Sequence, residues 1–386
     1  MKVCLLTLEW PDFGGGIGTY MYNLAKGLHL LGHNVTVITH NNQPRKIEGV
    51  NIIQVPIHNH NNLRKKVLRW RWEPHHSWSY DAWECFKNMN PAFDIIETAE
   101  YGAWARYFID HLNTPLVVRC HTPAHGIQEI SNNDNGRTPI WLKLEDKLEQ
   151  FQTKNADAIS APSHALSNHI CMSWGISTDK IKILPNPVDT DVFKPNGSTT
   201  KRKEILYVGR LQYNKGIYDL TEAVKPLLAE YPDLTLRIIG KDLPTPKCIR
   251  SQYKMASEEI LSRIAPQNRK QVIISGWVEP NEVIQHQQNA MCTVVPSRGF
   301  ESFSYTLTEQ MACGAAVVAT HCGGPTEIVN NEVDGLLVSV GDIPEMTMAL
   351  QRLIANPQFC RELGNRARKK VEEKYAIRKV VPKFAD

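Results

Sequence analysis

Two carboxylates, Glu301 and Glu309, bracket a segment that joins an apolar strand to a helix. The strand is expected at Met291–Val295, and a glycine-containing loop begins at Pro296. The first backbone N–H groups of a helix lack partners, and the helix dipole favours negative charge there. An anion is therefore expected beside two carboxylates, which themselves suit hydroxyl groups or a developing cation. Sugar nucleotides combine these features, although two glutamates near one helix also fit an ordinary charged surface.

The spacing of the two carboxylates suits a ligand made of two linked sugars. If residues 301 to 309 were helical throughout, the segment would rise by roughly 12 Å at about 1.5 Å per residue. This rise is comparable to the span from a hexose ring to a nucleotide ribose. One carboxylate would then be available for each sugar.

A second loop carries two cations, Arg210 and Lys215, between the expected strand Ile205–Val208 and the next helix. Fixed cations beside a glycine-marked helix start can neutralise a leaving nucleoside diphosphate without a metal ion. Two basic loop residues on a solvated surface are the alternative interpretation.

The residues around both loops resemble the retaining glycosyltransferases of family 4, which have the GT-B fold. The matching elements are Val208-Gly-Arg-Leu211, Lys215-Gly216, Glu301-x7-Glu309, Met311-Ala-Cys-Gly-Ala-Ala-Val-Val318 and Gly323-Gly-Pro-Thr-Glu327. The resemblance implies an α/β chain of two Rossmann-like, doubly wound domains facing across a cleft. The polar run 194–203 reads as a linker. We therefore expect an acceptor-binding domain at 1–196 and a donor-binding domain at 197–386, whose last residues cross back toward the first.

The resemblance also assigns roles within the second domain. Glu301 would contact the donor sugar, and Glu309 would contact the ribose. The backbone amides that would bind the diphosphate belong to Ser302, Phe303, Ser304, Tyr305 and Thr306. In the loop after the strand at 272–275, Trp277 or Val278 would lie against the nucleobase, and packing is an equal alternative for Trp277.

The amino-terminal half opens with a βαβ pattern. The strand Lys2–Leu8 is followed by a glycine cluster, the amphipathic helix Tyr20–Leu31 and the strand Val35–Thr39. The cluster departs from the dinucleotide pattern G-x-G-x-x-G, because Met21 stands where the third glycine belongs. The resemblance places the glycine pair Gly15 and Gly16 at the donor diphosphate, whereas the residues alone also fit a flexible turn.

Polar residues follow two further expected strands, Phe93–Glu97 and Leu116–Cys120. Ligands of open α/β sheets bind beyond such strand ends, so Glu100 and Tyr101 are predicted to bind the acceptor. The resemblance assigns His121 to the donor sugar near the reaction centre. A lone histidine after a strand is otherwise a simple loop contact.

Two other segments suggest functions that compete with plainer explanations. Residues 63–72 form a basic amphipathic segment, which either contacts an anionic membrane or is a solvated helix packed by its apolar stripe. Asp189-Thr-Asp191 has the form of a metal-binding D-x-D triplet. It follows Pro185-Asn-Pro-Val188, which resembles the turn before the family's linker, so we expect no metal there.

Composition excludes several classes of protein. The 386 residues, 42% hydrophobic and 22% charged, suit two globular domains. The net charge of +4 does not favour nucleic acid, and nine scattered cysteines fit reduced thiols in the cytoplasm. No apolar run reaches the length of a membrane span. The expected location is cytoplasmic, with a peripheral contact at the inner membrane face as the alternative for residues 63–72.

The sequence thus predicts a metal-independent, retaining glycosyltransferase that moves a hexose from a UDP- or GDP-sugar to an acceptor hydroxyl in glycan or glycoconjugate biosynthesis. Its catalytic residues would be His121, Arg210, Lys215 and Glu301. One alternative is a nicotinamide-dependent oxidoreductase, which lacks the required glycine spacing. The other is a non-catalytic protein of the same fold that binds sugar nucleotides.

Overall fold

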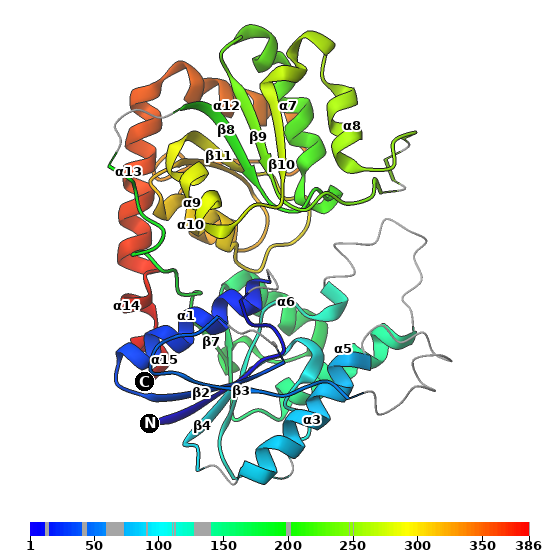
Figure 1. The fold of residues 1–386 in the computed structure, drawn as a ribbon, viewed down its shortest axis with the longest axis vertical. Helices are drawn as coiled ribbons and strands as arrows, with labels where there is room; N and C mark the ends of the chain where they lie inside the picture. Colours follow the sequence, from blue (N-terminus) through cyan, green and yellow to red (C-terminus); the bar gives the residue numbers. More distant parts are fainter. Residues whose placement is uncertain are drawn as a thin grey trace. The chain divides into compact units, whose positions relative to one another are not determined.

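The chain folds into two compact units, each built around a parallel sheet (Figure 1). The structure is a computed structural model that describes residues 1–11, 15–40, 45–58, 73–89, 92–109, 111, 113–126, 140–197, 202–246, 248–249 and 251–385. The first unit comprises the described residues up to Pro187 and the segment from Ile377 onward. The second unit runs from Val188 to Ala376.

The first unit contains a seven-stranded parallel sheet of order β3-β2-β1-β4-β5-β6-β7. The strands are β1 (Lys2–Leu6), β2 (Asn34–Thr39), β3 (Asn51–Gln54), β4 (Ile95–Ala99), β5 (Leu116–Arg119), β6 (Ala158–Ala161) and β7 (Ile181–Ile183). The helices are α1 (Gly16–Leu30), α3 (Glu73–Met89), α5 (Ile140–Lys154), α6 (His164–Trp174) and the single turns η1 (Tyr101–Ala103) and η2 (Thr178–Lys180). The direction in which successive strands are added to the sheet reverses between β1 and β4. Sheets of this kind bind ligands at such a reversal, beyond the carboxyl ends of the two strands.

The last segment of the chain belongs to the first unit. Helices α14 (Ile377–Val380) and α15 (Pro382–Ala385) pack on α1. The ring of Phe384 lies 6.0 Å from that of Tyr20 and 5.4 Å from the guanidinium carbon of Arg119. Because Arg119 is fully buried at the end of β5, the tail reaches the core of a unit that begins more than three hundred residues earlier.

The second unit contains a six-stranded parallel sheet of order β10-β9-β8-β11-β12-β13. The strands are β8 (Arg202–Val208), β9 (Thr235–Ile239), β10 (Val272–Gly276), β11 (Ala290–Val295), β12 (Ala316–Thr320) and β13 (Leu336–Val338). The helices are α7 (Ile217–Glu230), α8 (Ala256–Arg263), α9 (Pro280–Asn289), α10 (Tyr305–Ala312), α11 (Pro325–Ile328), α12 (Ile343–Ala355), α13 (Pro357–Lys374) and the turns η3 (Tyr213–Lys215) and η4 (Pro266–Gln271). Here sequence order reverses between β8 and β11.

Helices cover both faces of this second sheet. Val318 of β12 joins a core that includes residues of α7 and α12, whereas its neighbours Val317 and Ala319 join the core of α10 and α13. Successive side chains of a strand point to opposite faces, so a strand buried on both sides must be apolar throughout. The apolar run Ala316-Val-Val-Ala319 meets this requirement, and the hydroxyl of the polar Thr320 at its end donates to the carbonyl of Ser297 at 2.6 Å.

The boundary between the units lies between Pro187 and Val188, nine residues before the one expected from the linker composition. The backbone N–H of Val188 donates to the carbonyl of Tyr375 at 2.8 Å. Arg368 of α13 donates to the carbonyls of Thr190 and Phe193 at 3.1 and 2.6 Å. These bonds hold residues 188–193 on the second unit, ahead of the polar run.

Helix α1 and strand β3 differ from the sequence-based expectation. Helix α1 begins at Gly16 rather than at Tyr20, with Gly15 as its N-cap residue. The edge strand β3 is a four-residue element that the pattern did not predict. Within residues 241–262, Pro244 and Met255 form an isolated β-bridge just before α8. The carboxylate of Asp242 accepts the backbone N–H of Ser257 in the first turn of this helix. No helix among the described residues is long and apolar enough to cross a bilayer.

Candidate active site

In the second unit, the two predicted loops meet where the strand order reverses. The loop 209–216 follows β8, and the loop 296–304 follows the neighbouring strand β11. Lys215 Nζ lies 2.5 Å from Glu301 Oε1, and Ser297 Oγ donates to the same oxygen at 2.7 Å. Both charged side chains are partly buried. The structure therefore brings the predicted cation and the predicted sugar-binding carboxylate into one ion pair.

Close backbone packing sets the distance between the two loops. Gly216 has φ +70°, and a Cβ atom there would lie 1.7 Å from the carbonyl oxygen of Pro296. Only glycine adopts this conformation without strain and leaves room for that carbonyl. Asn214 reinforces the contact, because its carbonyl accepts the backbone N–H of Arg298 at 2.8 Å.

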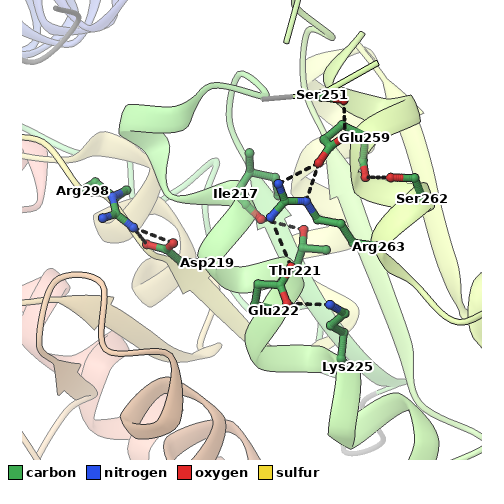
Figure 2. A network of polar contacts seen from close by, with 10 residues as sticks. All are labelled: Ile217, Asp219, Thr221, Glu222, Lys225, Ser251, Glu259, Ser262, Arg263 and Arg298. Carbon is green, nitrogen blue, oxygen red and sulfur yellow. Dashed lines mark hydrogen bonds and ion pairs between the residues drawn. The ribbon is translucent and has the colours of Figure 1, made fainter. Parts of the chain in front are cut away.

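Arg298 ties the same loops to helix α7. Its guanidinium nitrogen Nη1 donates to both carboxylate oxygens of Asp219 at 2.6 Å (Figure 2). The guanidinium carbon also lies over the ring of Tyr213 at 4.8 Å. Figure 2 also shows a separate ion pair further along α7, in which Arg263 contacts Glu222. Sequence reasoning did not single out Arg298 or Asp219, which are far apart in the chain.

The start of α10 lies directly beyond Glu301. Ser304 caps the helix, since its hydroxyl accepts the backbone N–H of Leu307 at 3.3 Å. Its φ of +145° is unusual for a residue with a side chain, and such backbone strain concentrates at functional sites. The carbonyl of Glu301 accepts the N–H of Gly324 at 2.7 Å. Residues 302–306 thus pass from loop into the first helical turn, where N–H groups lack partners within the helix.

Glu309 lies in the second turn of α10. Because the helix begins only at Tyr305, residues 301–309 are not helical throughout, and the rise of roughly 12 Å does not apply. The cap at Ser304 explains this difference. Burial raises the pKa of Glu309 to about 8, although part of the residue remains exposed.

The remaining predicted residues of this unit differ in exposure. Arg210 is exposed, and its carbonyl accepts the hydroxyl of Tyr207 at 2.8 Å. Trp277 follows β10 and is 69% exposed, whereas Val278 packs beside Leu206 and Ile239. The indole of Trp277 is therefore accessible to a planar ligand, and Val278 contributes to the core.

In the first unit, the predicted residues follow β1, β4 and β5, which are neighbours in the sheet. Gly15 lies in the segment after β1 and packs against Glu9. A Cβ atom at this position would lie 2.0 Å from the Glu9 carboxylate. Gly16 is the exposed first residue of α1. Sequence reasoning did not single out Glu9, although its place directly after a strand was the same signal that identified Glu100.

Glu100 is fully buried and supports the backbone of His121. Both of its carboxylate oxygens lie 2.8 Å from the His121 N–H. Burial raises the pKa of Glu100 to about 7, and it also raises the pKa of Tyr101 well above its usual range, with Glu9 adding to the effect. Tyr101 lies in η1, directly after Glu100. The predicted acceptor residues are therefore adjacent to His121, and Glu100 acts on its backbone.

His121 is buried, and its ring meets that of Tyr20 edge to face at 5.0 Å. Burial, with a smaller contribution from Arg119, holds the pKa of His121 well below its usual range, so the imidazole is neutral at pH 7. No partner for its Nε2 atom occurs among the described residues. A buried polar atom without a partner is costly, and a ligand that supplies one is favoured there.

Glu149 of α5 is a further buried carboxylate that the sequence did not reveal. It accepts the N–H groups of Gly102 and Ala124 at 2.9 and 2.8 Å. These two residues follow the loops that carry Glu100 and His121. Glu149 therefore holds the backbone after Glu100 and the backbone after His121 in place. The sequence did not reveal this role, because α5 meets these segments only in the folded chain.

Some predictions are not decided by these contacts. Residues 63–72 lie outside the described residues, so their membrane contact stays a prediction. Asp189 accepts the N–H groups of Asp191 and Val192 at 3.2 and 3.3 Å, which is a turn-forming role. Within the described residues, no group of His, Cys, Asp or Glu side chains is arranged to hold a metal ion.

Two family models match the chain in succession. The model of glycosyltransferase family 4 matches residues 14–192, and the model of glycosyl transferases group 1 matches residues 188–370. An uncharacterised glycosyltransferase of Methanocaldococcus jannaschii is 26% identical, with 97% of this chain and 95% of the relative covered. The boundary between the two matches agrees with the boundary between the two units.

Solved structures show the fold. The sucrose-phosphate synthase of Thermosynechococcus elongatus has a TM-score of 0.79 at 20% identity, covering 100% of this chain and 97% of that one. Anabaena HepE, solved in complex with UDP, has a TM-score of 0.72 at 17% identity, covering 100% and 98%. Both sheets of this chain and both family matches therefore agree with the expected architecture, and the chain belongs to the family 4 glycosyltransferases of GT-B fold.

Proposed function

We propose that this glycosyltransferase retains the anomeric configuration and moves a hexosyl group from a nucleoside diphosphate sugar to an acceptor hydroxyl. UDP- and GDP-sugars are the proposed donors, and a glycan, glycolipid or other glycoconjugate is the proposed product. The observation that carries the proposal is the ion pair of Lys215 and Glu301 beside the start of α10. It combines a cation, a carboxylate and the N-terminal end of a helix at one strand reversal.

The donor binds the second unit in this proposal. Lys215, Arg210 and the amides of residues 302–306 bind the diphosphate, and Glu301 binds sugar hydroxyls. Glu309 accepts hydrogen bonds from the ribose, and the exposed indole of Trp277 stacks on the base. Anabaena HepE, which shares the fold, was solved with UDP, and that complex supports a nucleotide donor.

In the proposed reaction, the bond between the anomeric carbon and the diphosphate oxygen breaks while the acceptor oxygen bonds to that carbon from the same face. The departing diphosphate takes the acceptor proton. Lys215 and Arg210 stabilise the negative charge that develops on the diphosphate. Glu301 stabilises the positive charge that develops on the sugar. Because Lys215 and Arg210 neutralise the diphosphate, the proposed reaction needs no metal ion.

The first unit supplies the acceptor side. Glu100 and Tyr101 are the proposed acceptor-binding residues, and the neutral imidazole of His121 offers its unpartnered Nε2 to a sugar hydroxyl. The N–H groups around Gly15 and Gly16 at the start of α1 are proposed to contact the diphosphate. Membership of a glycosyltransferase family sets the oxidoreductase alternative aside.

A donor screen tests the proposal. The protein should hydrolyse one of a panel of UDP-, GDP- and ADP-sugars slowly, without acceptor and in excess EDTA, and proton NMR should show the released hexose first as the donor anomer. Strict dependence on a divalent ion would contradict the metal-free mechanism, and release of the opposite anomer would contradict retention. Nucleotide binding without any turnover would favour the non-catalytic alternative.

A further inference from the structure

Helix α5 is anchored to the first unit through polar contacts on one side. Glu145 accepts from His76 Nε2 at 2.7 Å if that nitrogen carries the proton, and Glu149 holds the two loop amides described above. Gln152 accepts the N–H of Ala105 at 2.6 Å and donates to the carbonyl of Ala99 at 2.9 Å. Leu142 and Thr153 are also buried on this side. The side chains on the inward face of α5 are therefore buried or hydrogen-bonded within the first unit.

The outward face of α5 carries large apolar side chains and lysines. Ile140, Leu144 and Phe151 are 78%, 40% and 43% exposed. At about 100° per residue, these three residues fall within an arc of about 40° around the helix axis. Lys143, Lys147 and Lys154 occupy the adjacent arc of similar width. We call this face the α5 stripe, comprising Ile140, Lys143, Leu144, Lys147, Phe151 and Lys154.

The lysines of the α5 stripe are not neutralised by the fold. All three are exposed, and none has an ion-pair partner among the described residues. The acidic residues of α5 point elsewhere: Glu145 and Glu149 are buried, and Asp146 accepts from Trp174 Nε1 at 2.8 Å. The stripe therefore combines a positive row with an apolar row and has no carboxylate of its own.

We propose that the α5 stripe docks the protein on an anionic lipid surface. Ile140, Leu144 and Phe151 enter the boundary between headgroups and acyl chains, as the apolar face of an interfacial helix does. The long stems of the lysines let their ammonium groups reach lipid phosphates beside the inserted apolar row. A helix of fifteen residues, about 22 Å long, lies in the membrane plane in this arrangement.

Charge complementarity selects this occupant over a second copy of the chain. A second copy would bring its own positive row to the contact, whereas the described residues of the stripe contain no acid to meet it. A bilayer of anionic lipids provides mobile phosphates that can gather at each lysine. The proposal does not depend on the donor or on the reaction, so it can fail while the proposed transfer stands.

Vesicle co-sedimentation of the full chain tests the docking directly. The protein should bind vesicles of three parts phosphatidylcholine to one part phosphatidylglycerol at least tenfold more tightly than vesicles of phosphatidylcholine alone. The double variant Lys143→Glu/Lys147→Glu should lose this preference. The variant Leu144→Ser/Phe151→Ser should bind anionic vesicles several-fold more weakly even at low salt, because the apolar row contributes separately.

A matched control separates the stripe from net charge. Lys254→Glu/Lys270→Glu changes two exposed lysines of the second unit and lowers the formal net charge of +4 to zero, as the stripe variant does. The control should bind anionic vesicles like the wild type, and all variants should keep the wild-type melting temperature. Equal loss in the control, or wild-type binding by both stripe variants, would overturn the proposal. So would vesicle-independent dimerisation that the stripe variants abolish.

Discussion

Nη1 of Arg298 contacts both carboxylate oxygens of Asp219, and this ion pair joins the loop after β11 to the first turn of α7. Asp219 and Arg298 are 79 residues apart in sequence. Lys215 precedes Asp219 by four residues and Glu301 follows Arg298 by three, so both residues proposed for the reaction lie beside this pair in the chain. The pair therefore fixes the distance between the two loops. We expect Arg298 to be a positioning residue that acts through Lys215, because its backbone N–H also donates to the carbonyl of the neighbouring Asn214.

Replacing Arg298 with alanine should lower kcat by about tenfold and change the affinity for a nucleoside diphosphate much less. A factor of ten corresponds to about 1.4 kcal/mol of barrier. Arg298→Lys should recover only part of the rate, since an ammonium lacks the planar guanidinium that lies over the ring of Tyr213. Steady-state kinetics and nucleotide titration measure the two effects.

A double-variant cycle shows whether Arg298 acts through Lys215. In a Lys215→Ala background, Arg298→Ala should have little further effect on kcat. Arg263→Ala removes the separate pair with Glu222 on the same helix and should leave kcat unchanged (Figure 2). Full additivity, or an equal loss in the Arg263 variant, would mean that Arg298 only stabilises the unit.

Lys215→Ala and Glu301→Ala should each lower turnover by more than roughly tenfold, equivalent to about 1.4 kcal/mol or more. Each removes a charge that opposes one developing in the transition state. Circular dichroism should show a folded chain in both cases. Rates near the wild type in both variants would refute the assignment of these residues to the reaction.

Nucleotide binding should release a proton from Glu309. With its pKa raised to about 8 by burial, the carboxyl group is roughly half protonated at pH 8. Ribose hydroxyls donate to the ionised form, so binding lowers its pKa. Calorimetry of UDP or GDP binding at pH 8, in two buffers of different ionisation enthalpy, measures the protons released. Glu309→Gln should release none, and a wild-type value of zero would contradict the ribose contact.

Glu97 should make the first unit less stable as the pH rises from about 4.5 to about 7. Burial raises the pKa of Glu97 from 4.5 to about 7 against the opposing effect of the Tyr20 hydrogen bond, so the folded state retains a proton that the unfolded state loses. The stability contribution is complete below pH 4.5 and lost above pH 7. The neutral variant Glu97→Gln lacks this dependence.

The comparison of wild type with Glu97→Gln isolates this group from the buried histidines, which act in the opposite direction. The free energy of unfolding of the variant, relative to wild type, should rise by up to about 3 kcal/mol between pH 5 and pH 8. Tryptophan fluorescence in urea reports on the first unit, because every tryptophan except Trp277 belongs to it. A constant difference across this range would show that Glu97 ionises normally.

The sequence predicted most of the strands, and it identified Lys215 and Glu301, which the fold brings into contact, because both depend on local patterns. The apolar runs at β8, β11 and β12 and the motifs around Lys215 and Glu301 are continuous in the chain. The edge strand β3 was missed, since its four residues are partly exposed and show no clear alternation. The first residue of α10 could not be predicted from the local sequence either. Its N-cap residue, Ser304, has a positive φ, which the propensities of serine do not indicate.

Residues that act through distant contacts could not be found from the sequence. Glu149 reaches two loops that precede it by 25 and 47 residues, and Arg298 reaches Asp219 across 79 residues. Neither pair has a spacing that distinguishes it from surface charge. The domain boundary was displaced for a similar reason, since the contacts of Arg368 decide which unit residues 188–193 join.

The tail formed by α14 and α15 has a consequence for the order of events during protein synthesis. Most of the first unit is made before the residues of the second unit between Val188 and Ala376, yet Phe384 lies over its buried Arg119. The described residues of the second unit lie between Val188 and Ala376, so they can fold once Ala376 has left the ribosome. The first unit therefore completes its fold after the second, although most of it is translated earlier. Until residues 377–385 are synthesised, the surface of α1 that α14 and α15 contact stays exposed to solvent.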